Sequence, residues 1–350
     1  MIKSLVYIAV SFEDASTANV IQTNNMINAF RQNNISVFPY WKYRFRQGKI
    51  LSYFLNWFLE TKIFHYLYLI ILPIFVSIKY RKTTKNMFYT RSILVAYIIN
   101  IIVKKPILIE LHTAPRWKLE ILLLRNLKKN TKLIYLTDAV REKFETLNIG
   151  LKYQVAPDAH DFQILSLNDR AAKILNKNES IKIGYFGKYS EQKGSNILRE
   201  MVKLNPTWEF YIHTLNDNDL KAENIKKNCY LSREEVKLNM SQMDFLLLFV
   251  VPTFEKNDIS NYTSPLKLFE YTSSGGFIIA SDVPVLRELE GFNGICFSEN
   301  SAKAFGDAIK KIINDVRLQT NLQQGAWELA LANTWSTRAK NILIFASETK

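Results

Sequence analysis

Short apolar runs along the first half of the chain alternate with stretches in which apolar residues recur every three or four positions. The runs are typical of buried strands and cover Ser4–Ala9, Ile35–Tyr40, Met87–Thr90, Ile107–Leu111, Lys132–Leu136 and Tyr153–Ala156. The periodic stretches predict helices over Val20–Arg31, Ile93–Val103 and Ala139–Leu147. Because strands that alternate with helices favour a parallel sheet, we expect a doubly wound α/β domain over residues 1–160.

The same rhythm returns after the polar stretch Asp158–Ser180, in which we expect a linker over residues 161–180. Strands are predicted at Ile181–Phe186, Glu209–His213, Phe245–Val250 and Phe277–Ser281, and helices at Asn196–Leu204, Glu234–Met240, Pro265–Ser273 and Ala302–Asp315. The tail Asn321–Ser347 is also helical in pattern. The sequence therefore predicts a second Rossmann-like domain over residues 181–335 and a C-terminal helix, residues 336–350, that returns to the first domain.

Charge is distributed unevenly between these halves. Residues 1–160 hold 23 Lys and Arg against nine Asp and Glu, so the whole formal net charge of +14 falls on the first half. Residues 41–85 alone hold nine Lys and Arg, one acidic residue, and seven aromatics between Trp41 and Phe58. A basic and aromatic segment of this kind suits an anionic membrane surface. The alternative is that the aromatics form the core of the first domain and the lysines its solvated rim.

The longest apolar run, Tyr66–Ile78, has 13 residues and contains a proline. Because a spanning helix needs about 20 residues, this run predicts a buried or interfacial helix. The two cysteines, Cys229 and Cys296, match no metal-ligand spacing and are expected to be reduced thiols. The start, MIKSLVYIAVSFED, does not resemble a signal peptide. Together these features predict a cytoplasmic protein that is peripherally associated with the inner face of the membrane.

The segment with the most specific chemistry is TSPLKLFEYTSSGG. Ser264 is expected to be the N-cap of a helix, with Pro265 at its first position. A helix that starts there, after a buried strand, presents free backbone N–H groups at the carboxyl edge of a parallel sheet, which suits a diphosphate. Lys267 adds a positive charge at the helix start. Glu270 lies one turn further along, where a carboxylate can accept hydrogen bonds from the vicinal hydroxyls of a ribose.

This run resembles the signature of the family 4 glycosyltransferases. That family consists of retaining enzymes with the GT-B fold, in which two doubly wound domains face each other across a cleft. The resemblance is strong from residue 263 to residue 289 and looser elsewhere. It implies that the second domain binds the nucleotide sugar, through Ser264, Pro265, Leu266, Lys267 and Glu270.

Other segments resemble positions that border the substrates in this family. The loop GKYSEQKG, residues 187–194, resembles the one whose basic residues reach the donor diphosphate, which implies catalytic roles for Lys188 and Lys193. His112 follows the apolar run ILIEL, where the family places a histidine that faces the donor sugar, and it is the third catalytic candidate. The candidates on the acceptor or cleft side are Ser16, Thr17, Arg91 and Thr137.

Three positions depart from the family pattern. Tyr262 stands where many members have a second glutamate that contacts the donor sugar. The loop after the first strand has no glycine, so Ser16 and Thr17 are expected to offer hydroxyl donors there. The run His213–Asp217 replaces a glycine-rich turn. The first departure favours the alternative that the protein is a non-catalytic sugar-nucleotide or glycan-binding protein on the same scaffold.

The interpretation that accounts for most of these features is a hexosyltransferase. It would move a hexose-type sugar, with retention, from a nucleotide-diphosphate donor to a glycan or lipid-linked glycan acceptor in cell-surface polysaccharide synthesis. The expected partners are the nucleotide sugar, this acceptor on the first domain and an anionic membrane surface, but no nucleic acid, because no nucleic-acid motif occurs. No cofactor and no metal is expected, since the one Asp-x-Asp, Asp217–Asp219, lies in a stretch typical of a turn.

Overall fold

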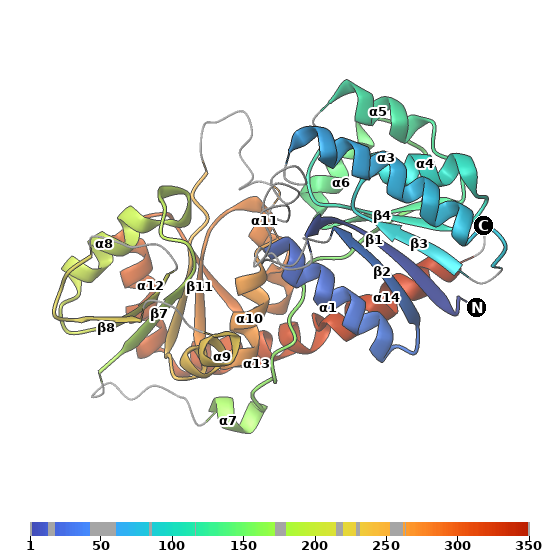
Figure 1. Cartoon of the computed structure of the whole chain (residues 1–350). Helices are drawn as coiled ribbons and strands as arrows, with labels where there is room; N and C mark the ends of the chain where they lie inside the picture. The colour runs from blue at the N-terminus through green and yellow to red at the C-terminus, as the bar shows by residue number, and fades with distance from the viewer. Residues whose placement is uncertain are drawn as a thin grey trace, which may run out of the picture. The chain divides into compact units, whose positions relative to one another are not determined.

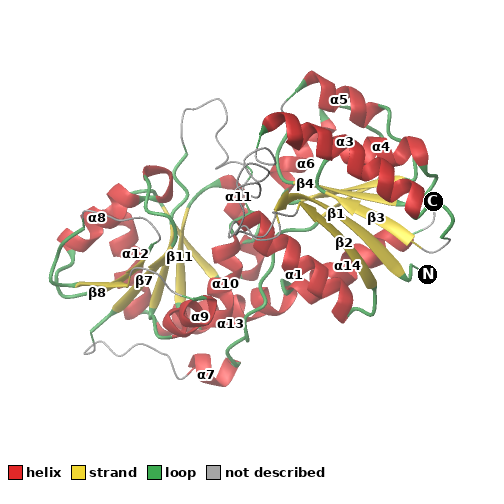
Figure 2. Ribbon diagram, viewed as in Figure 1, coloured by secondary structure: helices red, strands yellow, loops and turns green. Residues whose placement is uncertain are grey.

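The computed structural model describes residues 2–12, 18–42, 61–83, 86–115, 117–171, 180–214, 220–228, 232–252, 262 and 264–348. The chain divides into two compact units, one of residues 1–157 with 335–350 and the other of residues 158–334 (Figure 1). Each unit is built on its own six-stranded sheet covered by helices (Figure 2). The two doubly wound sheets confirm the fold class that the alternation of apolar runs predicted.

The sheet of the first unit is parallel throughout, in the order β2-β1-β3-β4-β5-β6. Its strands are β1 (Ser4–Phe12), β2 (Ser36–Lys42), β3 (Asn86–Thr90), β4 (Ile107–Leu111), β5 (Thr131–Tyr135) and β6 (Tyr153–Val155). β3 and β4 are buried at every position, as expected for parallel strands with helices on both faces. The order changes direction between β1 and β3, and ligands of open parallel sheets bind beyond the carboxyl ends of strands at such a switch point.

Helices cover both faces of this sheet. α1 (Ala18–Gln32) and the C-terminal α14 (Trp335–Ser347) lie on one face, and α3 (Lys62–Lys79) and α4 (Ile93–Ile102) lie on the other, with α5 (Lys118–Arg125) beside α4 (Figure 1). α6 (Asp138–Glu145) follows β5. Lys132 Nζ lies 2.9 Å from the carbonyl oxygen of Glu348, and the Asn33 amide donates to the Ser336 carbonyl at 3.1 Å. These contacts hold α14 within the first unit.

α3 contains the longest apolar run of the chain. The Thr61 hydroxyl caps its N-terminus by accepting from the N–H of Phe64 at 3.3 Å. Leu69, Val76 and Ser77 of this helix are buried. Seven large apolar side chains on its outer side are exposed: Tyr66, Leu67, Ile70, Ile71, Ile74, Phe75 and Ile78. Across the described ranges, no helix is long and apolar enough to cross a membrane.

One of the seven aromatics between Trp41 and Phe58 lies within the described residues. Trp41 is buried in the core of the first unit. The other six between residues 43 and 58 lie outside the described residues. The structure therefore assigns one of the seven to the core.

The sheet of the second unit is also parallel throughout, in the order β12-β11-β10-β7-β8-β9. Its strands are β7 (Lys182–Phe186), β8 (Glu209–His213), β9 (Ile225–Asn228), β10 (Phe245–Leu248), β11 (Phe277–Ser281) and β12 (Ile295–Ser298). The order changes direction between β7 and β10. The loops that follow these two strands therefore flank the switch point of this unit.

Two apolar layers cover the faces of this second sheet. On one face α8 (Ser195–Leu204) and α12 (Ala302–Asn314) pack around Phe210, Phe245 and Phe305. On the other, α9 (Arg233–Ser241), α10 (Leu266–Ser274) and α13 (Val316–Ala332) contribute Met240, Leu268 and Leu329 to a second cluster. The short helices are α7 (Leu167–Ala171), η1 (Glu191–Lys193), α11 (Pro284–Arg287) and η3 (Glu290–Phe292).

Residues 158–171, which include the start of the predicted linker, pack within the second unit. Phe162 joins the apolar core there. Arg170 on α7 is fully buried, and its guanidinium donates to the carbonyls of Leu165 at 2.9 Å and of Thr272 at 2.5 Å. Burial lowers the pKa of Arg170 to about 10. The boundary between the units falls at residues 157 and 158, before the predicted linker, whose residues 172–179 lie outside the description.

Candidate functional site

Two loops meet at the switch point of the second unit, one after β7 and one after β10. The β7 loop turns through η1 and Gly194, whose φ of 72° lies in the left-handed region. A Cβ at Gly194 would come within 2.4 Å of the Phe249 side chain, so conformation and space both require glycine. The N–H of Val251 donates to the carbonyl of Gln192 at 3.1 Å. This bond joins the two loops.

The β7 loop positions Lys188 and Lys193 through their backbones. The Tyr185 hydroxyl lies 2.7 Å from the carbonyl oxygen of Lys188 and 3.1 Å from that of Lys193. Lys188 is exposed, whereas Lys193 is half-buried, and burial lowers the pKa of its ammonium group. Within the part of the chain that the structure describes, nothing forms an ion pair or hydrogen bond with Lys193 Nζ. Lys193 is therefore a cation that a ligand can use.

The start of α10 differs from the prediction in one respect. Ser264 is not the N-cap; Pro265 occupies that position, with φ of −78° and ψ of 114°. The Ser264 hydroxyl instead accepts a hydrogen bond from the N–H of Asp158 at 3.0 Å, so it joins two segments of the second unit. Among the described residues no side chain caps α10, which leaves its first N–H groups for an anion. Leu266 is the first helical residue, and the helix ends at Gly275 with φ of 85°.

Glu270 lies one turn into α10 and is 3% exposed. Its Oε2 is 2.8 Å from Lys267 Nζ, and its Oε1 is 3.4 Å from Arg233 Nη1. The contact with Lys267 is an ion pair without hydrogen-bond geometry, so Oε2 keeps its capacity to accept a hydrogen bond. Arg233, the first residue of α9, also pairs with Asp161. Sequence reasoning missed Arg233, because only the packing of α9 against α10 brings it to Glu270.

His213 ends β8 beside the β7 loop, where the N–H of Gly187 donates to its carbonyl at 3.0 Å. The imidazole stacks on Phe186, with 4.6 Å between ring centroids. Burial lowers the pKa of His213 to about 4, so the ring is neutral near pH 7. Neither ring nitrogen has a hydrogen-bond partner within the described residues. The residue that replaces the family's glycine-rich turn thus adds a neutral ring, not a charge, to this edge.

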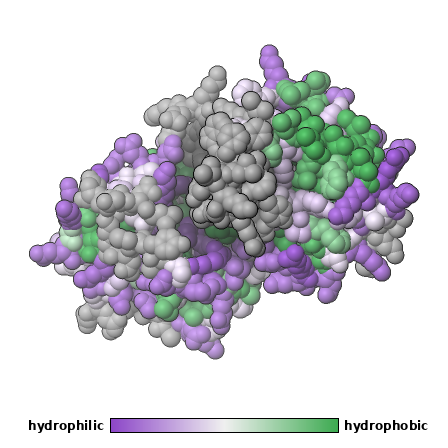
Figure 3. Space-filling model, viewed as in Figure 1, coloured by the Kyte–Doolittle hydropathy of each residue, from purple (hydrophilic) through white to green (hydrophobic). Residues whose placement is uncertain are grey.

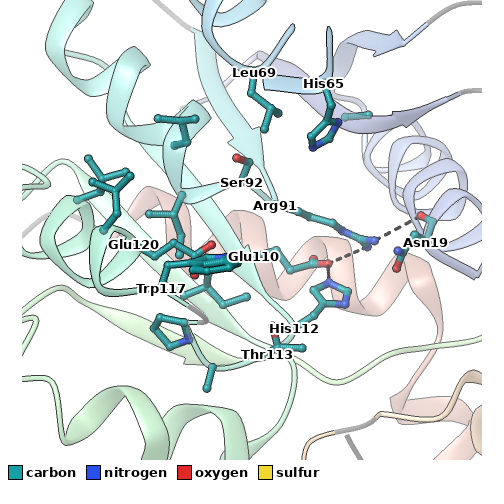
Figure 4. A pocket seen from close by; sticks show the side chains of 18 of the residues that line it. Asn19, His65, Leu69, Arg91, Ser92, Glu110, His112, Thr113, Trp117 and Glu120 are labelled. Carbon is teal, nitrogen blue, oxygen red and sulfur yellow. Dashed lines mark hydrogen bonds and ion pairs between the residues drawn. The ribbon is translucent and has the colours of Figure 1, made fainter. Parts of the chain in front are cut away.

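A pocket of about 690 Å³ lies in the first unit (Figure 4). Its polar side is formed by Asn19 and Thr23 of α1, by Arg91 after β3, and by Glu110 and His112 at the end of β4. Its apolar side comes from the helices on the other face, including Leu69 of α3, Leu94 of α4 and Leu119 of α5. The pocket therefore offers a polar floor and an apolar wall to a ligand.

Glu110 is the centre of the polar side. It is 1% exposed, and its Oε1 lies 2.8 Å from Arg91 Nη2 and 2.5 Å from His112 Nε2. Its Oε2 lies 3.0 Å from Arg338 Nη1 and also accepts from the Tyr89 hydroxyl. Burial opposes ionisation of Glu110, but the charges of Arg338 and Arg91 and the hydrogen bond from His112 outweigh it and hold its pKa well below the usual range. Glu110 is thus a carboxylate that accepts hydrogen bonds from His112, Tyr89 and Arg338 and forms an ion pair with Arg91.

The remaining candidates occupy different kinds of position. Arg91 lines the pocket and also donates to the Gln22 side chain at 3.1 Å. Thr137 is buried and caps α6 by accepting from the N–H of Val140 at 3.2 Å, and it does not line this pocket. Ser16 and Thr17 lie outside the described residues. Within the described parts of the chain, no cluster of His, Cys, Asp or Glu suits a metal ion, and Asp217–Asp219 lies outside them.

Comparison with known proteins shows what the chain resembles. No protein-family model matches it, and no curated protein is similar to it in sequence. Solved structures match it over nearly its whole length. HepE of Anabaena in complex with UDP-glucose is 12% identical, with a TM-score of 0.66, over 98% of this chain and 99% of that one. A glycosyltransferase from Rickettsia africae is 11% identical, with a TM-score of 0.70, over 99% and 98%.

A third match is the α,α-trehalose 6-phosphate synthase of Burkholderia multivorans, which is 11% identical with a TM-score of 0.64 and covers 99% of this chain and 96% of that one. At such identities the likeness concerns the fold. The chain has the GT-B fold of these glycosyltransferases, with two parallel six-stranded sheets. The narrower resemblance to family 4, read from residues 263–289, stays a prediction.

Proposed function

We propose that this protein is a retaining glycosyltransferase of the family 4 type. It transfers a hexose-type sugar from a nucleotide-diphosphate donor to a glycan or lipid-linked glycan acceptor in the synthesis of a cell-surface polysaccharide. The observation that carries this proposal is the environment of Glu270. This nearly buried carboxylate lies on α10, a helix without a side-chain cap that starts at the switch point of a doubly wound sheet. Two cations pair with it, Lys267 on the same helix and Arg233 on α9. The presence of UDP-glucose in HepE, a protein of the same fold, supports a nucleotide sugar as donor.

The donor is held by chemistry that the second unit supplies. Glu270 accepts hydrogen bonds from the ribose hydroxyls, and the N–H groups at the start of α10 contact the diphosphate with Lys267. Lys193, with Lys188 at the loop's outer side, stabilises the charge that develops on the departing diphosphate. His112 in the first unit faces the donor sugar, and the leaving phosphate itself takes the acceptor proton. The resemblance to family 4 implies that no metal is needed for this.

The acceptor is proposed to come from an anionic bilayer that the first unit contacts peripherally, at the inner face of the membrane. The large hydrophobic area in Figure 3 lies where Figure 1 labels α3, α4 and α5. The exposed large apolar side chains of these elements include those of α3, with Trp117 before α5 and Leu119 and Leu122 on it. α3 has no acidic residue and ends at Lys79, and Arg81 and Lys82 follow it. Apolar side chains beside unopposed cations match a negatively charged lipid surface.

A nucleotide-release assay tests this function. The purified protein is first screened by thermal shift against UDP-, GDP- and other nucleotide sugars, because a ligand that binds the native state raises its stability. The stabilising donor is then mixed with lipid-linked glycan acceptors, and release of free nucleotide is measured. We expect release that depends on the acceptor, and an α-linked product from an α-linked donor by NMR. Inversion at the anomeric carbon would contradict the retaining mechanism.

The second candidate function, a non-catalytic sugar-nucleotide or glycan-binding protein, is favoured by Tyr262 at the position of the family's second glutamate. The same assay separates the two. Stabilisation by a nucleotide sugar without release, with every acceptor tried, would support the binding protein. No stabilisation by any nucleotide sugar would contradict both.

A further inference from the structure

Glu110, on the polar side of the pocket in the first unit, is surrounded by side chains from segments that are far apart in sequence. Tyr89 and Arg91 come from the end of β3, Glu110 and His112 from β4, and Arg338 from the C-terminal helix α14. Tyr89, His112 and Arg338 donate hydrogen bonds to the Glu110 carboxylate, and Arg91 forms an ion pair with it. Figure 4 shows Arg91 and His112 converging on Glu110 at the edge of the pocket.

The ionised state of Glu110 fixes the proton on His112. A carboxylate only accepts hydrogen bonds, so the His112 Nε2 that lies 2.5 Å from it must carry the hydrogen. Burial and the charge of Arg91 lower the pKa of His112 below its ordinary value, against the hydrogen bond and charge of Glu110, so the ring is neutral near pH 7. A neutral ring with its proton on Nε2 has a bare lone pair on Nδ1. No residue in the described ranges donates to that nitrogen.

Arg338 holds Glu110 from the opposite side. Arg338 is 5% exposed, and its guanidinium donates to the carbonyls of Ala156 at 2.9 Å and of Pro157 at 2.7 Å while it pairs with Glu110. The Trp335 ring lies 5.6 Å from the guanidinium carbon. A planar fork held at three points has one orientation. Arg338 of α14 therefore fixes the position of the Glu110 carboxylate, although the two residues are far apart in sequence.

We infer that Glu110 is a positioning residue that keeps Nδ1 of His112 bare and turned to the pocket, so that it accepts a hydrogen bond from a sugar hydroxyl, and that Arg338 of the C-terminal helix locks Glu110 in place. This inference rests on the proposed transfer reaction. The hydroxyl can belong to the donor sugar or to the acceptor. A change in the Michaelis constant for one substrate but not the other distinguishes the two sources.

A direct measurement of the proton on His112 tests the inference without any assay of activity. The chain has four histidines, so ¹⁵N-histidine labelling gives a spectrum in which His112 is identified by its loss in His112→Gln. We expect protonated Nε2 and bare Nδ1 at neutral pH in the wild type. In Glu110→Gln, whose amide both donates and accepts, we expect a mixture of the two tautomers. A wild-type ring with its proton on Nδ1 would overturn the inference, whatever the enzyme does.

The pH dependence of transfer gives a second readout. The charged groups that act on the pKa of His112 are Glu110 on β4, Arg91 after β3 and Arg338 on α14. Protonation of His112 removes the lone pair of Nδ1 that accepts the hydrogen bond. As the pH is lowered, kcat/KM should therefore fall, and the midpoint of this fall should lie below the ordinary histidine pKa. Glu110→Gln removes what raises this pKa and leaves the arginines that lower it, so the midpoint should move further down. The rate at neutral pH should fall about 10- to 100-fold, as when a partner that orients a working histidine is lost.

Arg338→Lys tests the part played by the C-terminal helix. Lysine keeps the charge but lacks the planar fork, so it cannot bind Glu110 and both carbonyls together. We expect a lower kcat with unchanged affinity for the free nucleotide, because Glu270 and Lys267 belong to the other unit. The matched control is Arg170→Lys, which removes a buried fork from the second unit. Both variants should unfold at lower temperature, but only Arg338→Lys should change the His112 spectrum.

The outcomes separate this inference from the proposed function. A wild type that transfers sugar, with equal kcat and an unmoved acid limb in folded Glu110→Gln, would overturn the inference alone. A wild type that never releases nucleotide would overturn the proposed function, and the tautomer measurement would still decide the place of the proton. If Glu110→Gln does not fold, the wild-type spectrum and Arg338→Lys decide.

Discussion

Glu110 in the first unit and Glu270 in the second are both buried beside the carboxyl ends of parallel strands, but their surroundings differ. Glu110 in the first unit accepts three hydrogen bonds and pairs with two arginines, whose side chains are 12% and 3% exposed. Glu270 in the second unit has two cations, whose side chains are 34% and 35% exposed, and one oxygen that accepts no hydrogen bond from the described residues. Both oxygens of the Glu110 carboxylate accept hydrogen bonds from protein side chains, whereas Oε2 of Glu270 is left able to accept one from a ligand.

Burial alone does not distinguish these roles, because both residues are at most 3% exposed. The difference lies in the partners. A carboxylate whose hydrogen bonds are all internal stabilises and orients its neighbours, since removing it leaves buried charges without a counterion. A carboxylate paired with cations whose side chains reach water can exchange them for hydroxyl groups at small cost. We therefore expect changes at Glu110 to act on stability and changes at Glu270 to act on binding.

The largest expected effect is on the free energy of unfolding of Glu110→Ala. Removing this carboxylate leaves Arg91 and Arg338 buried without their counterion, and breaking such a pair typically costs about 3–5 kcal/mol. Glu270→Ala should cost much less, because both of its cations reach water. Urea unfolding of the two variants beside the wild type measures the difference. Equal losses of stability would remove the distinction between the two carboxylates.

The next largest effect concerns turnover, and it sharpens the role of the second unit. Lys193 carries a half-buried ammonium group that no described residue engages. Loss of one preorganised group that stabilises developing charge typically costs about 10²–10³ in rate. Lys193→Ala should therefore lower kcat by that factor and raise the Michaelis constant of the donor far less. The matched control is Lys203→Ala on the exposed side of α8. A change in the Michaelis constant alone would make Lys193 a uniform binding contact.

A smaller effect is expected on the affinity for the nucleotide. Glu270→Ala removes hydrogen bonds to a charged acceptor, each worth about 1.5–3 kcal/mol, so the dissociation constant for the free nucleotide should rise roughly 10- to 100-fold. Glu234→Ala on α9 removes an exposed carboxylate of the same unit and should leave that affinity unchanged. Calorimetric titration of both variants decides. Wild-type affinity in Glu270→Ala would refute its assignment to the donor.

Much of the fold could be predicted because apolar runs of four to six residues mark parallel strands that are buried on both faces. β4, β8 and β11 were predicted residue for residue. The strands that were missed, β9 and β12, are the edges of the second sheet. β9 reads IKKN, with two lysines where a central strand would be apolar, and β12 has four residues. Edge strands are short and polar, so their sequence carries a weak signal.

The candidate site was predictable only as far as neighbours in sequence define it. Lys267 and Glu270 are three residues apart on one helix, and their ion pair follows from that spacing. Arg233 and Arg338 reach their carboxylates only through the packing of α9 on α10 and of α14 on the first sheet. The expected cap at Ser264 was wrong because the N–H of Asp158 takes its hydroxyl. Tertiary contacts of this kind leave no periodic trace in the sequence.

The two units also differ at their surfaces. Residues 1–160, which include almost all of the first sheet and its helices, sum to +14, whereas residues 161–350 sum to zero. α3 of the first unit exposes seven large apolar side chains, and the described helices of the second unit expose isolated ones, such as Leu238 and Val316. Scattered apolar residues are normal on a protein surface, but a contiguous face is typical of an interaction site. If the proposed membrane contact is correct, substitutions should affect it only when they fall on the first unit.

Ile71→Ser should lower binding to anionic liposomes by about tenfold, because the 60% exposed side chain would leave the lipid interface and such an apolar group is worth about 1.5–3 kcal/mol when fully buried. Leu238→Ser, at 59% exposure on α9, is the matched control and should bind as the wild type does. Binding by co-sedimentation should weaken with salt, because each surface cation contributes about 1 kcal/mol and the Debye length falls to about 3 Å at 1 M. The binding that remains at high salt comes from the apolar side chains, and it should disappear in Ile71→Ser. Equal losses in both variants, or no binding to anionic vesicles by the wild type, would leave the exposed face of α3 without a role at the membrane.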